Sequence, residues 1–138
     1  RVHFLKDVYF GSHIDSTLVA LRPGLILANP ERLTMDTIPS FLKDWEIIFS
    51  PPMERQERHS AEYLRQAIGS EWIDMNLFSL DPETVVVDRH QSALIRLLER
   101  KGFDVAPLEL RHSRMLGGGF HCVTLDTRRR GIMDSYFN

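Results

Sequence analysis

The single cysteine of the chain, Cys122, follows three consecutive glycines in the stretch Met115–Cys122. A lone cysteine cannot form an intrachain disulfide, so it serves either packing or chemistry. Glycine lets the backbone approach a ligand without a Cβ in the way, so a planar cationic group could lie against this turn. We therefore take Gly118 as a candidate substrate-binding position and Cys122 as a candidate nucleophile. The alternative, that Cys122 packs as a small apolar residue, stays open on this evidence.

A histidine and a carboxylate, His13 and Asp15, lie two residues apart far upstream of the cysteine. On a strand, this spacing places both side chains on one face. A carboxylate beside a histidine favours the imidazolium, which can pass a proton to a leaving amine. A surface pair on a polar strand face would show the same spacing. Combined with Cys122, the pair favours an enzyme that acts on a guanidinium group.

Two other sites are disfavoured by the sequence. His121 is next to the cysteine, and adjacent strand residues face opposite ways, so it is a poor candidate for the partner base. One cysteine and six scattered histidines give no paired ligand spacing, so we expect no metal site. We also expect no cofactor.

Composition indicates one domain with small molecules or proteins as partners. With 138 residues, of which 43% are hydrophobic, the chain can bury a single core. A net charge of −2 provides no basic field for nucleic acid, and no apolar run approaches a membrane span. The basic triplet Arg128–Arg130 has acidic neighbours at Asp126 and Asp134, so we interpret it as a solvated turn. One unpaired cysteine and no signal pattern favour the cytoplasm.

The sequence contains an internal repeat of a β-β-α-β unit, which predicts an α/β fold. The units span approximately 12–50 and 73–110, and a strand over 120–125 is expected to open a further unit at 120–138. The helix of the first unit is expected from Asp36, a possible N-cap, to near Asp44. A short helix is expected between the units, from Ser60 to Ile68. Because the chain starts at Arg1 and an alternating strand pattern follows at once, we expect a fragment.

These residues resemble the C-terminal part of the amidinotransferases, the group containing arginine:glycine and arginine:inosamine-phosphate amidinotransferases. The resemblance covers residues 1–138. It rests on four stretches: Ser12–Thr17; Pro23-Gly24 with Asn29–Arg32; Trp72–Asn76; and Gly117–Gly131. It implies the pentein fold, in which five β-β-α-β units surround a polar channel, and this chain would hold about two and a half of them.

The resemblance also implies a role for each candidate residue. Cys122 matches the nucleophile that attacks the guanidinium carbon of L-arginine, which releases ornithine and leaves an amidino-cysteine for an acceptor amine. His13 matches the general acid and base. Asp15 matches a carboxylate that binds the guanidinium nitrogens, Arg32 an arginine that holds the substrate carboxylate, and Ser70 a serine that contacts the substrate.

Two alternatives remain beside this amidinotransferase assignment. One is a guanidino-group hydrolase of the same superfamily, in which water replaces the acceptor amine. The other is a non-catalytic half-pentein that serves as a binding or assembly module. Because half a propeller leaves sheet edges unpaired, we expect self-association or pairing with a missing N-terminal half.

Overall fold

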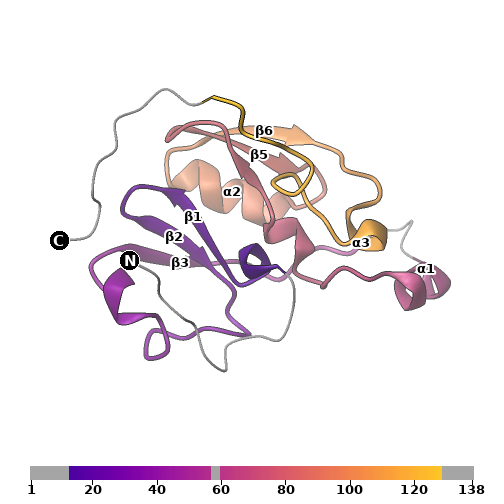
Figure 1. Cartoon of the computed structure of the whole chain (residues 1–138), viewed down its shortest axis with the longest axis horizontal. Coiled ribbons are helices and arrows are strands. Elements are labelled where there is room, and N and C mark those ends of the chain that lie inside the picture. Colours follow the sequence, from indigo (N-terminus) through magenta and orange to yellow (C-terminus); the bar gives the residue numbers. More distant parts are fainter. Residues whose placement is uncertain (1–12, 57–59, 129–138) are drawn as a thin grey trace.

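The first of two similar sheets contains β1 (Leu18–Arg22), β2 (Leu25–Ala28) and β3 (Glu46–Phe49), in that order, in a computed structural model that describes residues 13–56 and 60–128. β1 and β2 form an antiparallel hairpin, and β3 pairs with β2 in parallel (Figure 1). The hairpin turns at Gly24, whose φ of 82° lies in the left-handed region that glycine adopts without strain.

The second sheet repeats this arrangement with β4 (Phe78–Ser79), β5 (Thr84–Asp88) and β6 (Asp104–Leu108). β4 pairs antiparallel with β5, and β6 pairs with β5 in parallel. The helix α2 (Ser92–Arg100) connects the two parallel strands, as a crossover connection requires, and ends before Gly102 (φ 82°). The two sheets therefore confirm the predicted α/β class.

The crossover of the first unit is not the helix expected from Asp36 to Asp44. Only a 3-10 turn, η2 (Ser40–Leu42), forms there, and Asp36 does not cap it. Pro39 is extended (ψ 136°) and occupies the N-cap position, so the regular turn begins only after the proline. Proline also disfavours the helical region for the residue before it, which shortens any helix that would cross this point.

Besides η2, four short elements of the described residues lie outside the sheets: η1 (Ile14–Ser16), η3 (Ile73–Met75), α1 (Ala61–Gln66) and α3 (Ser113–Leu116). The helix α1 confirms the one predicted from Ser60, although it ends two residues earlier, and the Ser60 side chain accepts a hydrogen bond from the Tyr63 N–H. α1 and α3 lie side by side at one end of the molecule (Figure 1). Among the described residues no helix is long and apolar enough to span a membrane.

The segment expected as a strand, Phe120–Leu125, contains no strand in the structure. It forms turns in which Val123 N–H donates to the Gly119 carbonyl and Thr124 N–H to the His121 carbonyl. The strand expected at Val2–Leu5, and Arg129 and Arg130 of the basic triplet, lie outside the described residues.

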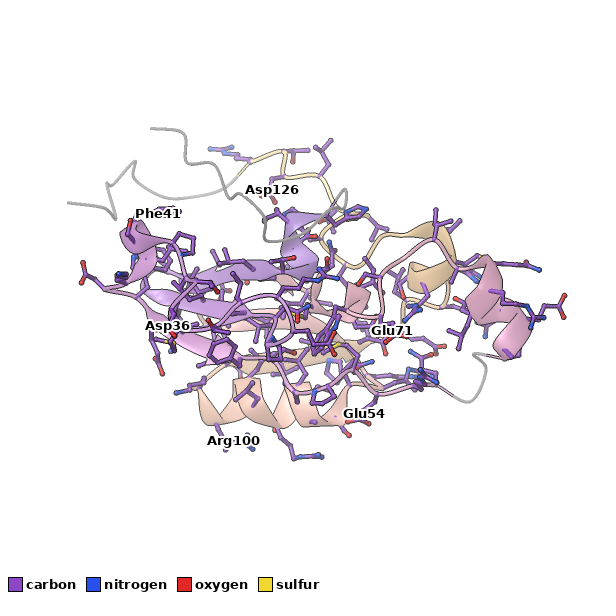
Figure 2. The ribbon with its side chains drawn as sticks, turned by 90° about the horizontal axis from the view of Figure 1, so that it is seen from below. Asp36, Phe41, Glu54, Glu71, Arg100 and Asp126 are labelled. Atoms are coloured by element: carbon purple, nitrogen blue, oxygen red, sulfur yellow. The ribbon has the colours of Figure 1, made fainter. Side chains whose placement is uncertain are left out.

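One apolar core joins the two sheets. It contains Leu25 and Leu27 from β2, Val85 and Val87 from β5, and Leu98 from α2, all at most 2% exposed. A smaller cluster covers the other face of the first sheet. Figure 2 shows the segment after the glycine run, marked by Asp126, on the opposite side of the sheets from α2, marked by Arg100.

Candidate active site

Cys122 and His13 lie side by side although they are 109 residues apart in sequence. The Cys122 Sγ atom is 3.4 Å from His13 Nδ1. His13 is the N-cap of η1 and Asp15 lies within that turn, so the predicted strand at this position is wrong. One polar atom from each of Cys122, His13 and Asp15 nevertheless lies within 4.8 Å of the other two. A nucleophile and a base within contact distance are the minimum arrangement for thiol chemistry.

Asn76 holds the cysteine from the other side. Its Nδ2 donates to Cys122 Sγ (3.0 Å), and its Oδ1 accepts from the Cys122 backbone N–H (3.1 Å). The Asn76 residue is 1% exposed. An amide offers one donor and one acceptor side by side, so it fixes both the sulfur and the backbone. Sequence reasoning assigned no role to Asn76; the only signal was its place in the stretch Trp72–Asn76.

The glycines before the cysteine make this contact possible. A Cβ at Gly119 would lie 2.5 Å from the Asn76 carbonyl oxygen and 2.8 Å from its Oδ1. A Cβ at Gly118 would lie 3.0 Å from the Cys122 Cβ. The helix α3 ends at Gly117, which has a φ of 69°. Thus the glycine run allows the turn to press Cys122 against η3.

The Asp15 carboxylate has an oxygen that can still accept hydrogen bonds. Its Oδ1 is buried and has no hydrogen-bond partner in the described part of the chain. Its Oδ2 lies 3.5 Å from His121 Nδ1, whose side chain is 65% exposed. His121 and Cys122 lie in a turn and not in the predicted strand, so their side chains do not have to face opposite ways. A buried carboxylate oxygen without a partner is costly, so this atom is suited to a ligand that donates hydrogen bonds.

Arg32 and Ser70 form a separate part of the site. The Arg32 Nη1 donates to the Ser16 carbonyl and hydroxyl and to the Thr17 hydroxyl, and its Nη2 donates to Ser70 Oγ at 2.8 Å. The Ser70 hydroxyl also accepts from the Trp72 N–H. The structure thus brings these two predicted residues together and ties them to η1, the turn that contains Asp15.

A cavity of about 350 Å³ lies beside the reactive pair. Its lining includes His13, Gly118 and Cys122, and apolar side chains form much of its wall: Leu110, Leu116 and Val123. Asp15, Arg32 and Ser70 are not among its lining residues. Cys122 itself is exposed, so a molecule in this cavity can reach the sulfur.

A half-buried carboxyl, that of Asp74, lies in η3 two residues before Asn76. Burial, and next the negative charge of Asp88, raise the pKa of Asp74 to about 6. Hydrogen bonds from Gln91 (2.7 Å) and Ser113 (3.5 Å) act in the opposite direction. Through these contacts Asp74 connects η3, which precedes Asn76, to Gln91, the N-cap residue of α2, and to Ser113, the first residue of α3.

The sequence matches no family model. It is 45% identical to inosamine-phosphate amidinotransferase 1 of Streptomyces glaucescens, over 99% of this chain and 38% of that protein. It is 39% identical to the L-arginine:L-lysine amidinotransferase of Pseudomonas savastanoi pv. phaseolicola, over 99% of this chain and 36% of that protein. The mitochondrial glycine amidinotransferase of Xenopus tropicalis is 36% identical over 91% of this chain and 29% of its own length.

The solved structures that this chain resembles are also amidinotransferases. The inosamine-phosphate amidinotransferase of Streptomyces griseus superposes with a TM-score of 0.85 and 45% identity, covering 100% of this chain and 38% of that one. An amidinotransferase from the saxitoxin pathway of Microseira wollei has a TM-score of 0.80 and 38% identity, covering 92% of this chain and 34% of that one. The pentein-type fold is thereby confirmed, and the chain spans less than two fifths of the length of the relatives it matches.

Proposed function

We propose that this chain, a relative of the amidinotransferases over nearly all of its length, carries the cysteine and histidine of an amidino-transfer site. The observation that supports this proposal most directly is the contact between Cys122 Sγ and His13 Nδ1, at 3.4 Å, beside the partly unsatisfied carboxylate of Asp15. The proposed donor is L-arginine, and the proposed intermediate is an amidino-cysteine.

In the first half-reaction, the Cys122 thiolate attacks the guanidinium carbon and forms a C–S bond. The bond from that carbon to the side-chain nitrogen of arginine breaks, and the His13 imidazolium gives this nitrogen its proton, so that ornithine leaves as a neutral amine. A guanidinium is stabilised by resonance, so both a strong nucleophile and protonation of the leaving group are required. Asn76 holds the sulfur for attack through its Nδ2–H.

In the second half-reaction, an acceptor amine attacks the amidino carbon while neutral His13 takes its proton. The C–S bond then breaks and returns the thiolate. The relatives are named for inosamine phosphate, L-lysine and glycine. We therefore propose a primary amine as the acceptor class and leave its identity to experiment.

The substrate is held at two ends in this proposal. Two guanidinium N–H groups donate to the Asp15 carboxylate, whose Oδ1 has no partner among the described residues, and the planar group lies against Gly118. Arg32 and Ser70 receive the substrate carboxylate: the Arg32 guanidinium supplies the positive charge, and the Ser70 hydroxyl, which accepts from Arg32 Nη2 and from the Trp72 N–H, has its own hydrogen to donate. Self-association or pairing with an N-terminal half supplies the remaining polar groups.

The test is the intact mass of the purified chain after incubation with L-arginine and no acceptor. We expect one added amidino group on Cys122 and ornithine in the supernatant. Cys122→Ser should abolish both, and His13→Asn should slow adduct formation by roughly 100-fold or more, the usual value of general acid–base catalysis. His90→Asn changes a histidine that pairs with Asp88 and is not among the residues that line the cavity, and it should leave the rate unchanged.

The alternatives predict other products. Ornithine release by the Cys122→Ser variant would show that Cys122 is not the nucleophile. Urea or ammonia released without any acceptor amine would favour the guanidino-group hydrolase. The absence of an adduct both in this chain and in a longer gene product would favour the non-catalytic module.

A further inference from the structure

The reactive cluster combines three kinds of metal ligand that are scattered in sequence. Cys122 offers a sulfur, His13 a ring nitrogen and Asp15 a carboxylate oxygen, all within 4.8 Å of one another. Their spacing along the chain predicts no metal site, but the fold brings the three ligand atoms together. Cys122 is exposed, so a hydrated ion can reach the cluster from solvent.

We propose that Cys122, His13 and Asp15 form a regulatory site for a thiophilic divalent cation, with Zn²⁺ as the best match. Zinc bonds of about 2.3 Å to sulfur and about 2.0–2.1 Å to nitrogen or oxygen place tetrahedral ligand atoms roughly 3.5 Å apart. The distance of 3.4 Å between Cys122 Sγ and His13 Nδ1 matches this separation, and the Asp15 oxygen lies within 4.8 Å of both atoms, so it reaches the ion by an adjustment of about an ångström.

The donor set selects the ion. A thiolate is a soft ligand that discriminates against Mg²⁺ and Ca²⁺, which prefer oxygen, and an imidazole suits Zn²⁺ and Co²⁺. Three protein ligands leave the fourth tetrahedral position open for water. His121 Nδ1 lies 3.5 Å from Asp15 Oδ2, so the ring of His121 is close enough to compete with water for that position.

The surroundings favour the bound form. Asn76 donates from Nδ2 to Cys122 Sγ, and such a contact orients a metal-bound thiolate. When the ion binds, the S–H bond breaks, its proton passes to solvent, and sulfur donates an electron pair to the metal. One thiolate and one carboxylate then balance the two positive charges of the ion, and no oxidant or reductant takes part.

Metal and substrate exclude each other at this site. The sulfur that would attack the guanidinium carbon and the nitrogen that would carry the proton both become ligands, and the Asp15 oxygens that would receive the guanidinium face the ion. This regulatory consequence rests on the proposed function. The binding of the ion does not rest on it, and each can be measured without the other.

To test this proposal, Co²⁺ is added stepwise to the full chain, whose cysteine is kept reduced in a buffer without chelator. We expect one ion per chain, a thiolate-to-cobalt charge-transfer band in the near ultraviolet, intense visible bands typical of tetrahedral cobalt, and loss of all of them when Zn²⁺ is added. Cys122→Ser should remove the charge-transfer band, and His13→Asn and Asp15→Asn should weaken binding. His90→Asn, a histidine outside the cavity lining, should bind as the unchanged chain does.

A second measurement needs no variant. Zn²⁺ should slow alkylation of Cys122 by iodoacetamide in the unchanged chain, and a chelator should restore the rate. Absence of a charge-transfer band together with unchanged alkylation would overturn the proposal. So would binding that persists in Cys122→Ser with the same affinity. A chain that binds Co²⁺ through Cys122 but forms no amidino adduct would support this site and count against the transfer reaction.

Discussion

The sulfur of Cys122 has two neighbours of different character. His13 Nδ1 is a titratable group that can exchange a proton with the thiol, whereas Asn76 Nδ2 is a permanent donor that keeps its hydrogens at every step. A fixed donor stabilises negative charge on sulfur and also returns the side chain to one position after each turnover. Asn76 is therefore a positioning residue in the proposed reaction.

Replacing Asn76 with alanine tests this role. A hydrogen bond to a charged group contributes about 1.5–3 kcal/mol, so we expect alkylation of Cys122 to slow by roughly 10- to 100-fold in Asn76→Ala. The measurement is the rate of iodoacetamide modification, followed by intact mass over a range of pH. Asn76→Gln keeps the amide one methylene further from the backbone and should recover part of the rate. Equal rates in the unchanged chain, Asn76→Ala and Asn76→Gln would show that Asn76 has no positioning role.

The residue types of this site were accessible from the sequence, but their partners were not. A single cysteine after three glycines, and a histidine two residues from a carboxylate, are patterns that a reader can connect to thiol chemistry. The contacts of Asn76 with Cys122 and of Arg32 with Ser70 join positions 46 and 38 residues apart. Such contacts depend on how turns pack, and no local pattern encodes them.

At the scale of elements, the two turns that carry the chemistry were predicted as strands. In a strand, His13 and Asp15 would share a face because alternate residues point the same way. In the structure they are close because His13 is the N-cap of the 3-10 turn η1 and Asp15 lies within that turn. In contrast, the β-β-α-β order predicted for the unit at approximately 73–110 matches β4, β5, α2 and β6, because the apolar periodicity of these elements reflects a buried face. Site segments carry polar side chains and glycines for chemistry, so periodicity gives little guidance there.

Gly119 sets the distance between the cysteine turn and η3. Because a Cβ there would meet the Asn76 carbonyl oxygen at 2.5 Å, we expect Gly119→Ala to push the turn away and break both Asn76 contacts. Adduct formation with L-arginine should fall by at least as much as in Asn76→Ala. Leu125→Ala, three residues after the cysteine, 86% exposed and not among the residues that line the cavity, is the matched control, and its activity should be unchanged. Full activity in Gly119→Ala would show that the turn tolerates displacement.

Asp74 makes the packing of η3 depend on pH. Its folded pKa of about 6 lies above the ordinary value of 3.8, so between those values the folded state keeps a proton that the unfolded state has lost. Stability from this group is therefore full below about pH 4 and is lost as the pH rises through about 6. The pKa difference corresponds to roughly 3 kcal/mol.

Asp74→Asn removes this charge while keeping a side chain that can bond Gln91 and Ser113. We expect the variant to be more stable than the unchanged chain at pH 7, by up to about 3 kcal/mol, with little difference at pH 4. Urea unfolding at a series of pH values measures this. Asp81→Asn, an exposed carboxyl whose pKa is lowered by hydrogen bonds from backbone N–H groups, should show no such gain at pH 7. An Asp74→Asn variant that is less stable at pH 7 would contradict the sign.

At the scale of the whole molecule, the repeat was the most predictable feature, because each unit is specified by a hairpin and a crossover that recur along the chain. The way the units join was not predictable. The larger core cluster contains side chains from β2, η3, β5 and α2, so the two sheets share one core. Arg22 adds a second connection, since its guanidinium donates to the Lys101 carbonyl and lies 4.6 Å from the centre of the Phe103 ring.

This shared core leads us to expect that the two units unfold together. Leu98→Ala removes a fully buried side chain from α2 and should cost about 2–5 kcal/mol. If the core is common, hydrogen exchange should accelerate by similar factors in β2 and β5, although β2 lies in the other sheet. Leu125→Ala, 86% exposed, should change stability by less than about 0.5 kcal/mol. Faster exchange in β4–β6 alone would show that the two units unfold independently. The site takes His13 from the first unit and Asn76 from the second. In that case the association of two separate units, and not a common core, would assemble the site.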